Sequence, residues 1–314
     1  MVNSIVYGPV PSRRLGRSMG INNIPPKTCS YSCVYCQVGN TIDMQLERKA
    51  FYDPVEIAHI AKEKVKRIKQ KGEPIDYLAF VPDGEPTLDV NLGGEINLLK
   101  SLDIKIAVIT NASLLWQEDV RKALYNADWV SFKVDTVSEK TWRTLNRAHK
   151  SLDLSEILDG MIKFANTFQG ELTTESMLIQ DINDNDGEIE RIASFLVQIK
   201  PTKAYVAIPT RPPAQRTITA ASKHTVNIAY HIFRKRLTNV ECLNNYEGNA
   251  FTFSGNIEDE LLGITSVHPM RKEAVTELLK KANSGWGTVE KLISNGSLLE
   301  VEYQGNKFYM KRLR

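Results

Sequence analysis

Apolar and polar residues alternate along the chain with the periods of helices and strands. The clearest helical pattern follows Asp53, where apolar residues recur at positions 57, 60, 61, 65 and 68. Pro54 suits the first helical position, and Gly72 follows the last apolar residue of the pattern. The pattern therefore predicts a helix that begins at Pro54 and ends before Gly72.

Short apolar runs with the length of buried strands recur between helical stretches. We predict strands at 75–81, 104–109, 129–134, 172–179 and 204–208, and a first strand within 16–23. Six strands separated by helices indicate about six βα units, and thus an α/β protein with parallel strands. In such folds ligands collect at the carboxyl ends of the strands, so residues that follow each strand are the candidates for chemistry.

The segment from about residue 256 has a different pattern. His268-Pro269 opens a predicted helix through residue 282, and Trp286 lies in a second helix that ends near residue 296. Two strands, 298–303 and 307–312, flank a turn. Helix, helix and hairpin follow one another in this order in a small winged-helix unit. We predict two domains, 1–255 and 256–314, the second winged-helix-like.

Composition narrows the class of protein. The chain has 314 residues, of which 42% are hydrophobic and 25% charged, as in ordinary soluble proteins. No apolar run approaches the roughly 18–20 residues of a membrane span, so we expect no membrane association. The first residues also lack the pattern of a signal peptide. We expect a cytoplasmic protein, where clustered cysteines indicate metal ligands rather than disulfides.

Charge is distributed unevenly along the chain. The formal net charge is +3, but residues 268–314 carry nine Lys and Arg against five Glu. The rest of the chain has 31 basic and 32 acidic residues and is nearly neutral. The excess of four fits a surface that faces an anionic partner, and fits a solvated surface equally well.

Three of the four cysteines lie within eight residues. Cys29, Cys33 and Cys36 have the spacing C-x3-C-x2-C, and the aromatic Tyr35 precedes the last of them. Iron–sulfur clusters are normally held by four thiolates, so three thiolates would leave one iron open to a substrate or cofactor. The alternative is a zinc site completed by Cys242, since zinc usually has four ligands. Otherwise Cys242 is an ordinary buried thiol.

This spacing, on a loop after a first strand, resembles the radical S-adenosylmethionine (SAM) superfamily. The resemblance implies a partial (βα)6 TIM-like barrel and a [4Fe-4S] cluster on the three cysteines, whose open iron binds S-adenosyl-L-methionine. One electron from the cluster would cleave SAM to methionine and a 5′-deoxyadenosyl radical, which abstracts hydrogen from the substrate. A flavodoxin- or ferredoxin-type donor would supply the electron.

Strand-end motifs extend the resemblance. Asp83-Gly84-Glu85-Pro86 resembles the family's Gly-Gly-Glu-Pro element, with Asp83 in place of a glycine. The resemblance implies that Gly84, Glu85 and Pro86 contact the SAM ammonium. The other SAM contacts that it implies are Tyr35 beside the adenine, and Asn111, Lys133, Asp135 and Glu175. The alternatives are a plain turn for 84–86, a turn role for Asn111 and a structural ion pair for Lys133 and Asp135.

A closer resemblance is to the group related to tRNA wyosine (imidazoguanine-forming) synthase. The motifs that carry it are Tyr7 to Ser18, Lys27-Thr28-Cys29, Gly84 to Thr87, Asn146-Arg147, Ile182-Asn183-Asp184 and Thr210-Arg211-Pro212-Pro213. Wyosine synthases carry further cysteines for a second cluster, whereas no cysteine precedes Cys29 here. We therefore expect one cluster, and the wyosine reaction itself is not implied.

Five arginines are candidate contacts for an anionic substrate group, because a guanidinium matches phosphate and carboxylate geometry. They are Arg13, Arg14, Arg17, Arg211 and Arg216. Surface solvation or pairing with a structural carboxylate is the alternative for each.

Together these features predict a radical SAM Fe-S oxidoreductase. A tRNA base is one candidate substrate, and a peptide or small metabolite is another. A non-catalytic, metal-binding regulator that binds nucleic acid is the alternative from a different class. The substrate, the fate of SAM and the oligomeric state are open at this stage, and no side chain is assigned to the chemistry on the substrate.

Overall fold

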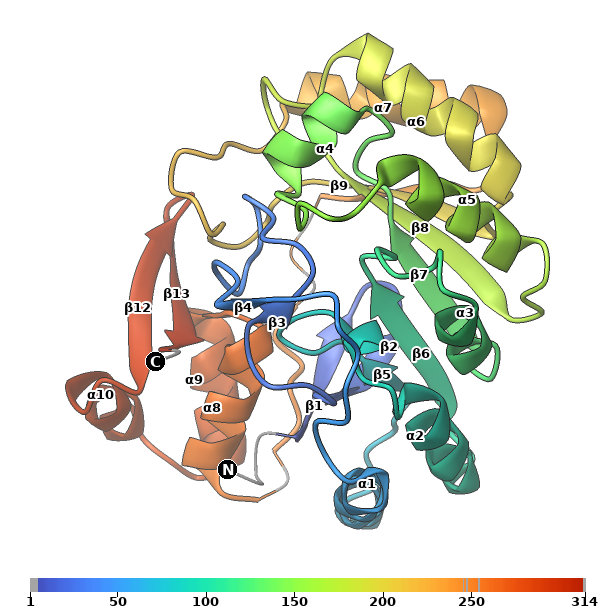
Figure 1. Ribbon diagram of the computed structural model, residues 1–314. Coiled ribbons are helices and arrows are strands. Elements are labelled where there is room, and N and C mark those ends of the chain that lie inside the picture. Colours follow the sequence, from blue (N-terminus) through green and yellow to red (C-terminus); the bar gives the residue numbers. More distant parts are fainter. Residues whose placement is uncertain (1–4, 245, 247, 254, 313–314) are drawn as a thin grey trace.

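The computed structural model describes residues 5–244, 246, 248–253 and 255–312. Its centre is an eight-stranded sheet with the order β1-β2-β5-β6-β7-β8-β9-β10 (Figure 1). The strands are β1 Val6–Ser12, β2 Gly16–Ile21, β5 Tyr77–Phe80, β6 Lys105–Thr110, β7 Trp129–Lys133, β8 Glu171–Met177, β9 Lys203–Ala207 and β10 Val240–Leu243. All neighbours are parallel except β1 and β2, which are antiparallel. The predicted α/β class and all six predicted strands are confirmed, while β1 and β10 were not predicted.

Helices cover the outer face of this sheet. They are α1 Pro54–Gln70, α2 Leu92–Leu99, α3 Glu118–Leu124, α4 Glu139–Leu145, α5 Leu154–Ala165, α6 Asp186–Ile199 and α7 Lys223–Arg236. The predicted helix α1 is confirmed: the Asp53 side chain accepts a hydrogen bond from the Val55 amide at 2.9 Å, and Gly72 follows the end with a φ of +71°. Such caps satisfy backbone groups that the helix leaves unpaired at its ends.

The sheet curves into a partial barrel. Val10 of β1 and Leu243 of β10 line the same cavity, although these two edge strands do not pair with each other. Inside the curve, Ala79, Ala107 and Trp129 pack with residues of β9 and β10. Small side chains next to a large one fill the narrow interior, and the open seam between the edges leaves room for a site.

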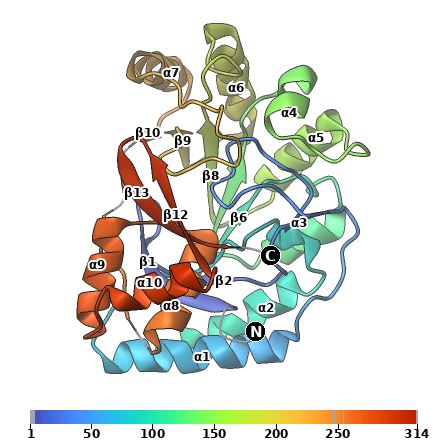
Figure 2. The ribbon, with the colours of Figure 1, turned by 90° about the vertical axis from the view of Figure 1, so that its left-hand side faces the viewer.

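The C-terminal segment forms a separate layer beside β1 (Figure 2). It contains α8 Ile257–Val267, β11 Met270–Arg271, α9 Lys272–Lys281, α10 Gly287–Ser294, β12 Leu298–Tyr303 and β13 Asn306–Lys311, with the sheet order β11-β13-β12. We call residues 257–311 the C-terminal unit. The helix predicted from His268 begins instead at Lys272, because Met270 and Arg271 pair with β13. The winged-helix comparison and the boundary at residue 256 stay predictions.

The C-terminal unit shares its core with the barrel. Tyr7 and Val10 of β1 pack in one apolar cluster with Leu261 and Ile264 of α8. A buried ion pair between Lys64 of α1 and Glu260 of α8 joins the same two parts. These contacts hold the unit in a fixed position over one side of the barrel. Among the described residues, no helix has the length and apolar character needed to cross a membrane.

Candidate active site

A cavity of about 330 Å³ lies at the carboxyl ends of the parallel strands. The cysteine loop, the loop after β5 and the ends of β7 and β8 line it. Val267 and His268 of the C-terminal unit form another part of its wall. The position agrees with the expectation that ligands collect at this end of an α/β fold.

The three clustered cysteines all line this cavity. Their loop is held from one side by the end of α4: the amides of Ser32 and Val34 donate to the carbonyls of Asn146 and Leu145, each at 3.0 Å. From the other side, the amide of Glu85 donates to the Thr28 carbonyl at 3.1 Å. The loop therefore has a defined conformation before any ligand is bound.

Gly84 permits this close approach. Its φ is +156°, and a Cβ at this position would lie 2.0 Å from the Thr28 carbonyl oxygen. No side chain fits there without moving the backbone of the cysteine loop. The glycine of the Gly84-Glu85-Pro86 motif thus joins the strand-end motif to the cysteine motif.

The Glu85 carboxylate lies behind the cavity wall. It is buried, and it accepts hydrogen bonds from the hydroxyls of Thr87 and Thr110 at 2.5 and 2.6 Å. The amides of Thr87 and Asn111 donate to it at 3.1 and 2.7 Å. Burial raises the pKa of Glu85, although these donors oppose the shift. The structure gives this side chain the role of joining the β5 loop to the end of β6, while Asp83 and Gly84 face the cavity.

Two asparagines donate to cysteine sulfurs. The side-chain amide of Asn111 lies 3.6 Å from Sγ of Cys29, and that of Asn146 lies 3.5 Å from Sγ of Cys33. Burial raises the pKa of Cys33 to about 12, with Asp135 as the next cause, so the free thiol is protonated. Metal coordination deprotonates such thiols, and donors to the sulfur stabilise the resulting thiolate.

The donor set fits a cluster better than a single ion. Within the described part of the chain, no three His, Cys, Asp or Glu side chains converge closely enough to hold one metal ion. Cys242 lies in β10 and does not line the cavity, so it does not complete a zinc site with the other cysteines. Three thiols spread over one cavity wall suit an iron–sulfur cluster, whose ligands bind different irons.

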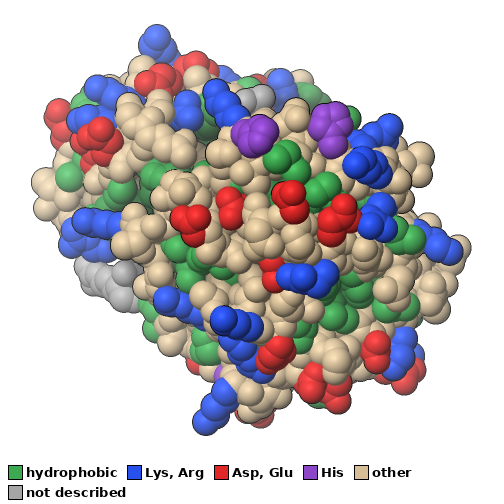
Figure 3. Space-filling view, turned by 90° about the horizontal axis from the view of Figure 1, so that it is seen from above, with side chains coloured by type: hydrophobic (Ala, Val, Ile, Leu, Met, Phe, Trp, Pro, Cys, Tyr) green, Lys and Arg blue, Asp and Glu red, His purple; other side chains and the backbone are tan. Residues whose placement is uncertain are grey.

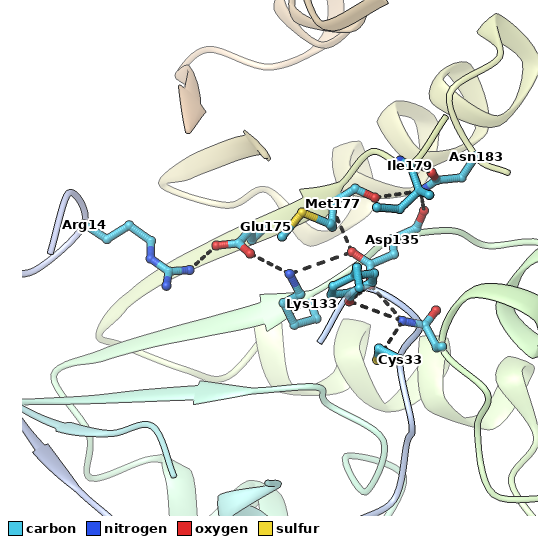
Figure 4. Close-up of polar contacts among 10 residues, drawn as sticks. Arg14, Cys33, Lys133, Asp135, Glu175, Met177, Ile179 and Asn183 are labelled. Carbon is cyan, nitrogen blue, oxygen red and sulfur yellow. Dashed lines mark hydrogen bonds and ion pairs between the residues drawn. The ribbon is translucent and has the colours of Figure 1, made fainter. Parts of the chain in front are cut away.

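Charged residues at the ends of β7 and β8 form a chain of contacts (Figure 4). Arg14 and Lys133 both pair with the Glu175 carboxylate. Burial disfavours the charge of Glu175, but Arg14 and then Lys133 outweigh it and lower the pKa of this carboxyl to about 2. The Lys133 ammonium also lies 5.1 Å from the ring centre of Tyr35. All four side chains line the cavity.

Asp135 supports this chain from behind. Its side chain has no exposed surface, and it accepts hydrogen bonds from the Tyr35 hydroxyl, the Asn146 amide at 2.8 Å and the Met177 backbone at 2.8 Å (Figure 4). Lys133 approaches it only to 3.9 Å. Asp135 does not line the cavity, so its carboxylate orients Tyr35 and the cysteine loop in this structure. Asn146 was named in the sequence only as part of a family motif, and its hydrogen bond to Asp135 was not predicted.

The comparisons with known proteins agree with this geometry. The family model described as Radical SAM superfamily matches residues 23–196. A UPF0026 protein of Methanocaldococcus jannaschii is 47% identical over 99% of this chain and 97% of that protein. The chain belongs to the radical SAM superfamily and to the UPF0026 proteins.

Solved structures share the radical SAM fold. A radical SAM methyltransferase from Sphaerobacter thermophilus aligns with a TM-score of 0.53 at 14% identity, over 72% of this chain and 66% of that chain. The chain thus spans just under two thirds of that enzyme. The neighbours also include archaeal TYW1, with a TM-score of 0.47 at 13% identity, over 70% of this chain and 72% of that chain.

The five predicted arginines separate into two groups around the radical SAM cavity. Arg13, Arg14 and Arg211 line it. Arg17 pairs with Glu73 outside the cavity, and Arg216 is exposed and does not line it either. The prediction of an anion contact is therefore not supported by the position of Arg17 or Arg216, because neither side chain reaches the cavity.

Other residues of the radical SAM cavity were not predicted. The Arg211 guanidinium donates to the Gln37 side chain and lies 3.0 Å from the His268 ring. Burial and then the Arg211 cation lower the pKa of His268 well below its usual value. Lys27 and Asp83 form an ion pair at 3.1 Å within the cavity wall. Two signals for this pair were present in the sequence: Asp83 replaces a glycine of the family motif, and Lys27 belongs to the Lys27-Thr28-Cys29 motif.

Proposed function

We propose that this chain is a radical SAM oxidoreductase that binds a single [4Fe-4S] cluster on Cys29, Cys33 and Cys36. The observation that carries the proposal is the placement of these three thiols along one cavity at the strand ends, with no fourth cysteine among the described residues that line it. When bound, the cluster and SAM supply a reductive cleavage that yields a 5′-deoxyadenosyl radical for hydrogen abstraction.

The residues of the cavity suggest how SAM would be oriented. Lys133 and Glu175 both line the cavity. The Lys133 ammonium would bind the carboxylate of SAM, and the Glu175 carboxylate would accept hydrogen bonds from its hydroxyl groups. Tyr35 offers a ring that Asp135 holds in place by its hydroxyl. Glu85, Asn111 and Asp135 lie behind the residues that line the cavity, where they fix the cysteine loop and the strand ends. Gly84 brings its backbone to the cavity, and Pro86 begins the short helical turn Pro86–Leu88 that follows.

The substrate that we propose carries an anionic group. Arg13 and Arg211 lie in the cavity lining, and burial lowers the pKa of Arg211 to about 9, with the Arg13 cation as the next cause. A buried anion beside these two guanidiniums would relieve their repulsion. A phosphate or a carboxylate has the required charge and shape.

A tRNA base is one substrate that meets this description. The excess of four positive charges in residues 268–314 supports it, and the C-terminal unit contributes Val267 and His268 to the cavity. Against it, the face seen from above shows Lys, Arg, Asp and Glu interspersed and no extended positive surface (Figure 3). A peptide or a small metabolite with an acidic group is the other candidate, since it would carry the same anionic charge.

The tRNA hypothesis has a direct test. If the protein binds tRNA through phosphate contacts, the affinity should fall steeply as salt rises from about 50 to 200 mM. Binding that does not respond to salt, or stimulation of SAM cleavage by peptide or small-molecule fractions only, would contradict this substrate.

Metal analysis tests the proposed function itself. After anaerobic reconstitution, the wild-type protein should hold about four irons with sulfide, as a [4Fe-4S] cluster requires. Cys33→Ala should lose the cluster, whereas Cys242→Ala should retain it as a matched control, because Cys242 lies outside the cavity. One tightly bound zinc without sulfide would instead favour the non-catalytic, nucleic-acid-binding regulator.

We also propose a flavodoxin- or ferredoxin-type electron donor and a reducing, cytoplasmic location. Both follow from the need of such a cluster for low-potential electrons and reduced thiols.

A further inference from the structure

The pair of Lys27 and Asp83 is the charged feature of the cavity that the proposed function leaves unused. The two side chains are only 5% and 3% exposed, and their charged groups lie 3.1 Å apart. Apart from this contact, neither group makes a hydrogen bond to another described residue. Buried charges normally make several hydrogen bonds. The charges of this pair are therefore available to interact with a ligand in the cavity.

The backbone fixes Lys27 in an unusual conformation. Its φ is +64°, a value that side-chain-bearing residues rarely adopt. The Lys27 amide donates to the Asp83 carbonyl at 2.7 Å, and its own carbonyl accepts from the amides of Ile42 and Asp43 at 3.1 Å each. Strained residues that the surrounding structure holds in place are concentrated at functional sites.

The ammonium of Lys27 points to the cysteine loop. A Cβ on Gly39 would lie 3.6 Å from the Lys27 Nζ, and the Gly39 amide donates to the Cys36 carbonyl at 3.1 Å. Lys27, Asp83 and Cys36 all line the same cavity. The ammonium of the pair therefore lies beside the segment that follows Cys36.

We propose that the Lys27–Asp83 pair sets the reduction potential of the cluster held by Cys36 and its neighbours. This inference rests on the proposed function. One-electron reduction adds a negative charge to the cluster, so a nearby cation favours the reduced form and a nearby anion disfavours it. In a dry site these effects are strong, because little water screens them. The negative charge of Asp83 limits the effect of Lys27. Both residues act on the cluster through their charge and are not catalytic residues.

The sign of each change follows from this arrangement. Asp83→Asn keeps the shape of the side chain and removes the anion, so the potential should rise. Lys27→Gln removes the cation, so the potential should fall. The potential of the double variant should lie between those of the two single variants. Lys27→Arg should keep a potential near that of the wild-type protein, because it retains the positive charge.

The experiment is an anaerobic redox titration of the cluster-loaded protein without SAM, followed by the electron paramagnetic resonance signal of the reduced cluster. Each single variant should change the equilibrium constant of the one-electron reduction about tenfold, which corresponds to about 59 mV. Asp43→Asn is the matched control: its carboxylate is exposed on the neighbouring strand Asp43–Met44, so water screens it and the potential should not move.

The outcomes separate this inference from the proposed function. If the wild-type protein binds no iron–sulfur cluster, the proposed function fails. If it binds the cluster and cleaves SAM, but a folded single variant keeps the wild-type potential or shifts it against the predicted sign, only the present inference is wrong. Either single variant decides the sign, so poor folding of one does not prevent the test.

Discussion

Two buried lysine–carboxylate pairs lie in different regions of this molecule and differ in their hydrogen bonds. Lys64 and Glu260 join α1 to the C-terminal unit, and Lys27 and Asp83 face the cavity. Exposure does not distinguish them, since it is 7% and 6% for the first pair and 5% and 3% for the second. The Lys64 ammonium donates to both Glu260 oxygens at 3.0 and 3.1 Å and to the Val6 carbonyl at 3.4 Å. Within the described part of the chain, the second pair makes only its single ion contact.

The difference indicates different roles. A buried pair with satisfied hydrogen bonds fixes the relative position of two elements, whereas a buried pair with unused hydrogen-bonding capacity is suited to respond to a ligand. A similar contrast separates Asp83 from the other carboxylates of the site. Glu85 and Asp135 accept several internal hydrogen bonds and hold the scaffold, and Glu175 faces the cavity but pairs with Arg14 and Lys133. Asp83 has only its Lys27 contact among the described residues.

The largest effect is expected for Lys64→Met, which leaves Glu260 as a buried carboxylate without its cation. Breaking such a pair costs about 3–5 kcal/mol of the free energy of unfolding. Urea unfolding measures this, with Lys66→Met on the exposed face of the same helix as control. Replacing both partners with apolar residues should recover most of the loss. A loss below about 1 kcal/mol for the single variant would mean that the pair does not fix the C-terminal unit.

The next effect concerns Glu175, a cavity carboxylate that two cations stabilise. Its pKa is lowered from 4.5 to about 2, so the ionised form stabilises the folded protein above the ordinary pKa by about 3 kcal/mol. This stabilisation is lost as the pH falls from 4.5 toward 2. Glu175→Gln should therefore be less stable by about 3 kcal/mol near neutral pH.

The difference between Glu175→Gln and the wild-type protein should shrink as the pH is lowered, and urea unfolding at several pH values measures it. A difference that stays constant down to about pH 2 would show that the ion pairs with Arg14 and Lys133 do not stabilise the fold.

A smaller effect is expected for Gly84→Ala. The added Cβ would lie 2.0 Å from the Thr28 carbonyl oxygen, so the cysteine loop must move, at a cost of about 1–3 kcal/mol. Iron content after reconstitution should fall in parallel, because the Cys29 segment is displaced. Gly94→Ala in α2 is the control, since a Cβ there meets nothing within 4 Å. Full iron loading of Gly84→Ala would show that this contact does not position the cysteines.

The smallest effect provides the baseline for the buried pairs. Glu118 and Lys122 pair at 2.7 Å on the surface of α3, where both side chains are well exposed. Lys122→Ala should leave the free energy of unfolding unchanged within error, because solvent screens the charges. A clear loss of stability here would remove the contrast between exposed and buried pairs.

Much of the fold could be predicted from the sequence because its signals are local. The apolar runs of the six parallel strands and the caps of α1 each lie within a few residues. β10 was not predicted because Val240–Leu243 is short and mixes apolar with polar residues. The start of α9 was misplaced because Met270 pairs with Tyr309 and Arg271 with Phe308 of β13. No local pattern records contacts between residues so far apart in the sequence.

The sequence named many of the residues that the structure places around the cavity, but not their orientation. The cysteine spacing identified the three thiols, and the strand-end motifs identified the loops around them. The sequence could not show that Glu85 and Asp135 turn away from the cavity, since their donors come from distant strands and loops. The places of His268 and Lys27 in the cavity were not predicted for the same reason: only the packing of the C-terminal unit and the conformation of residue 27 bring them there.

The most direct test of the central claim is the formation of 5′-deoxyadenosine from SAM. The cluster-loaded wild-type protein, reduced with dithionite, should release this product, and Cys242→Ala should match it. Cys33→Ala should release none, because the cavity then lacks one of its three thiolates. Product formation by Cys33→Ala at the wild-type rate, or no product from a fully loaded wild-type protein, would contradict the assignment.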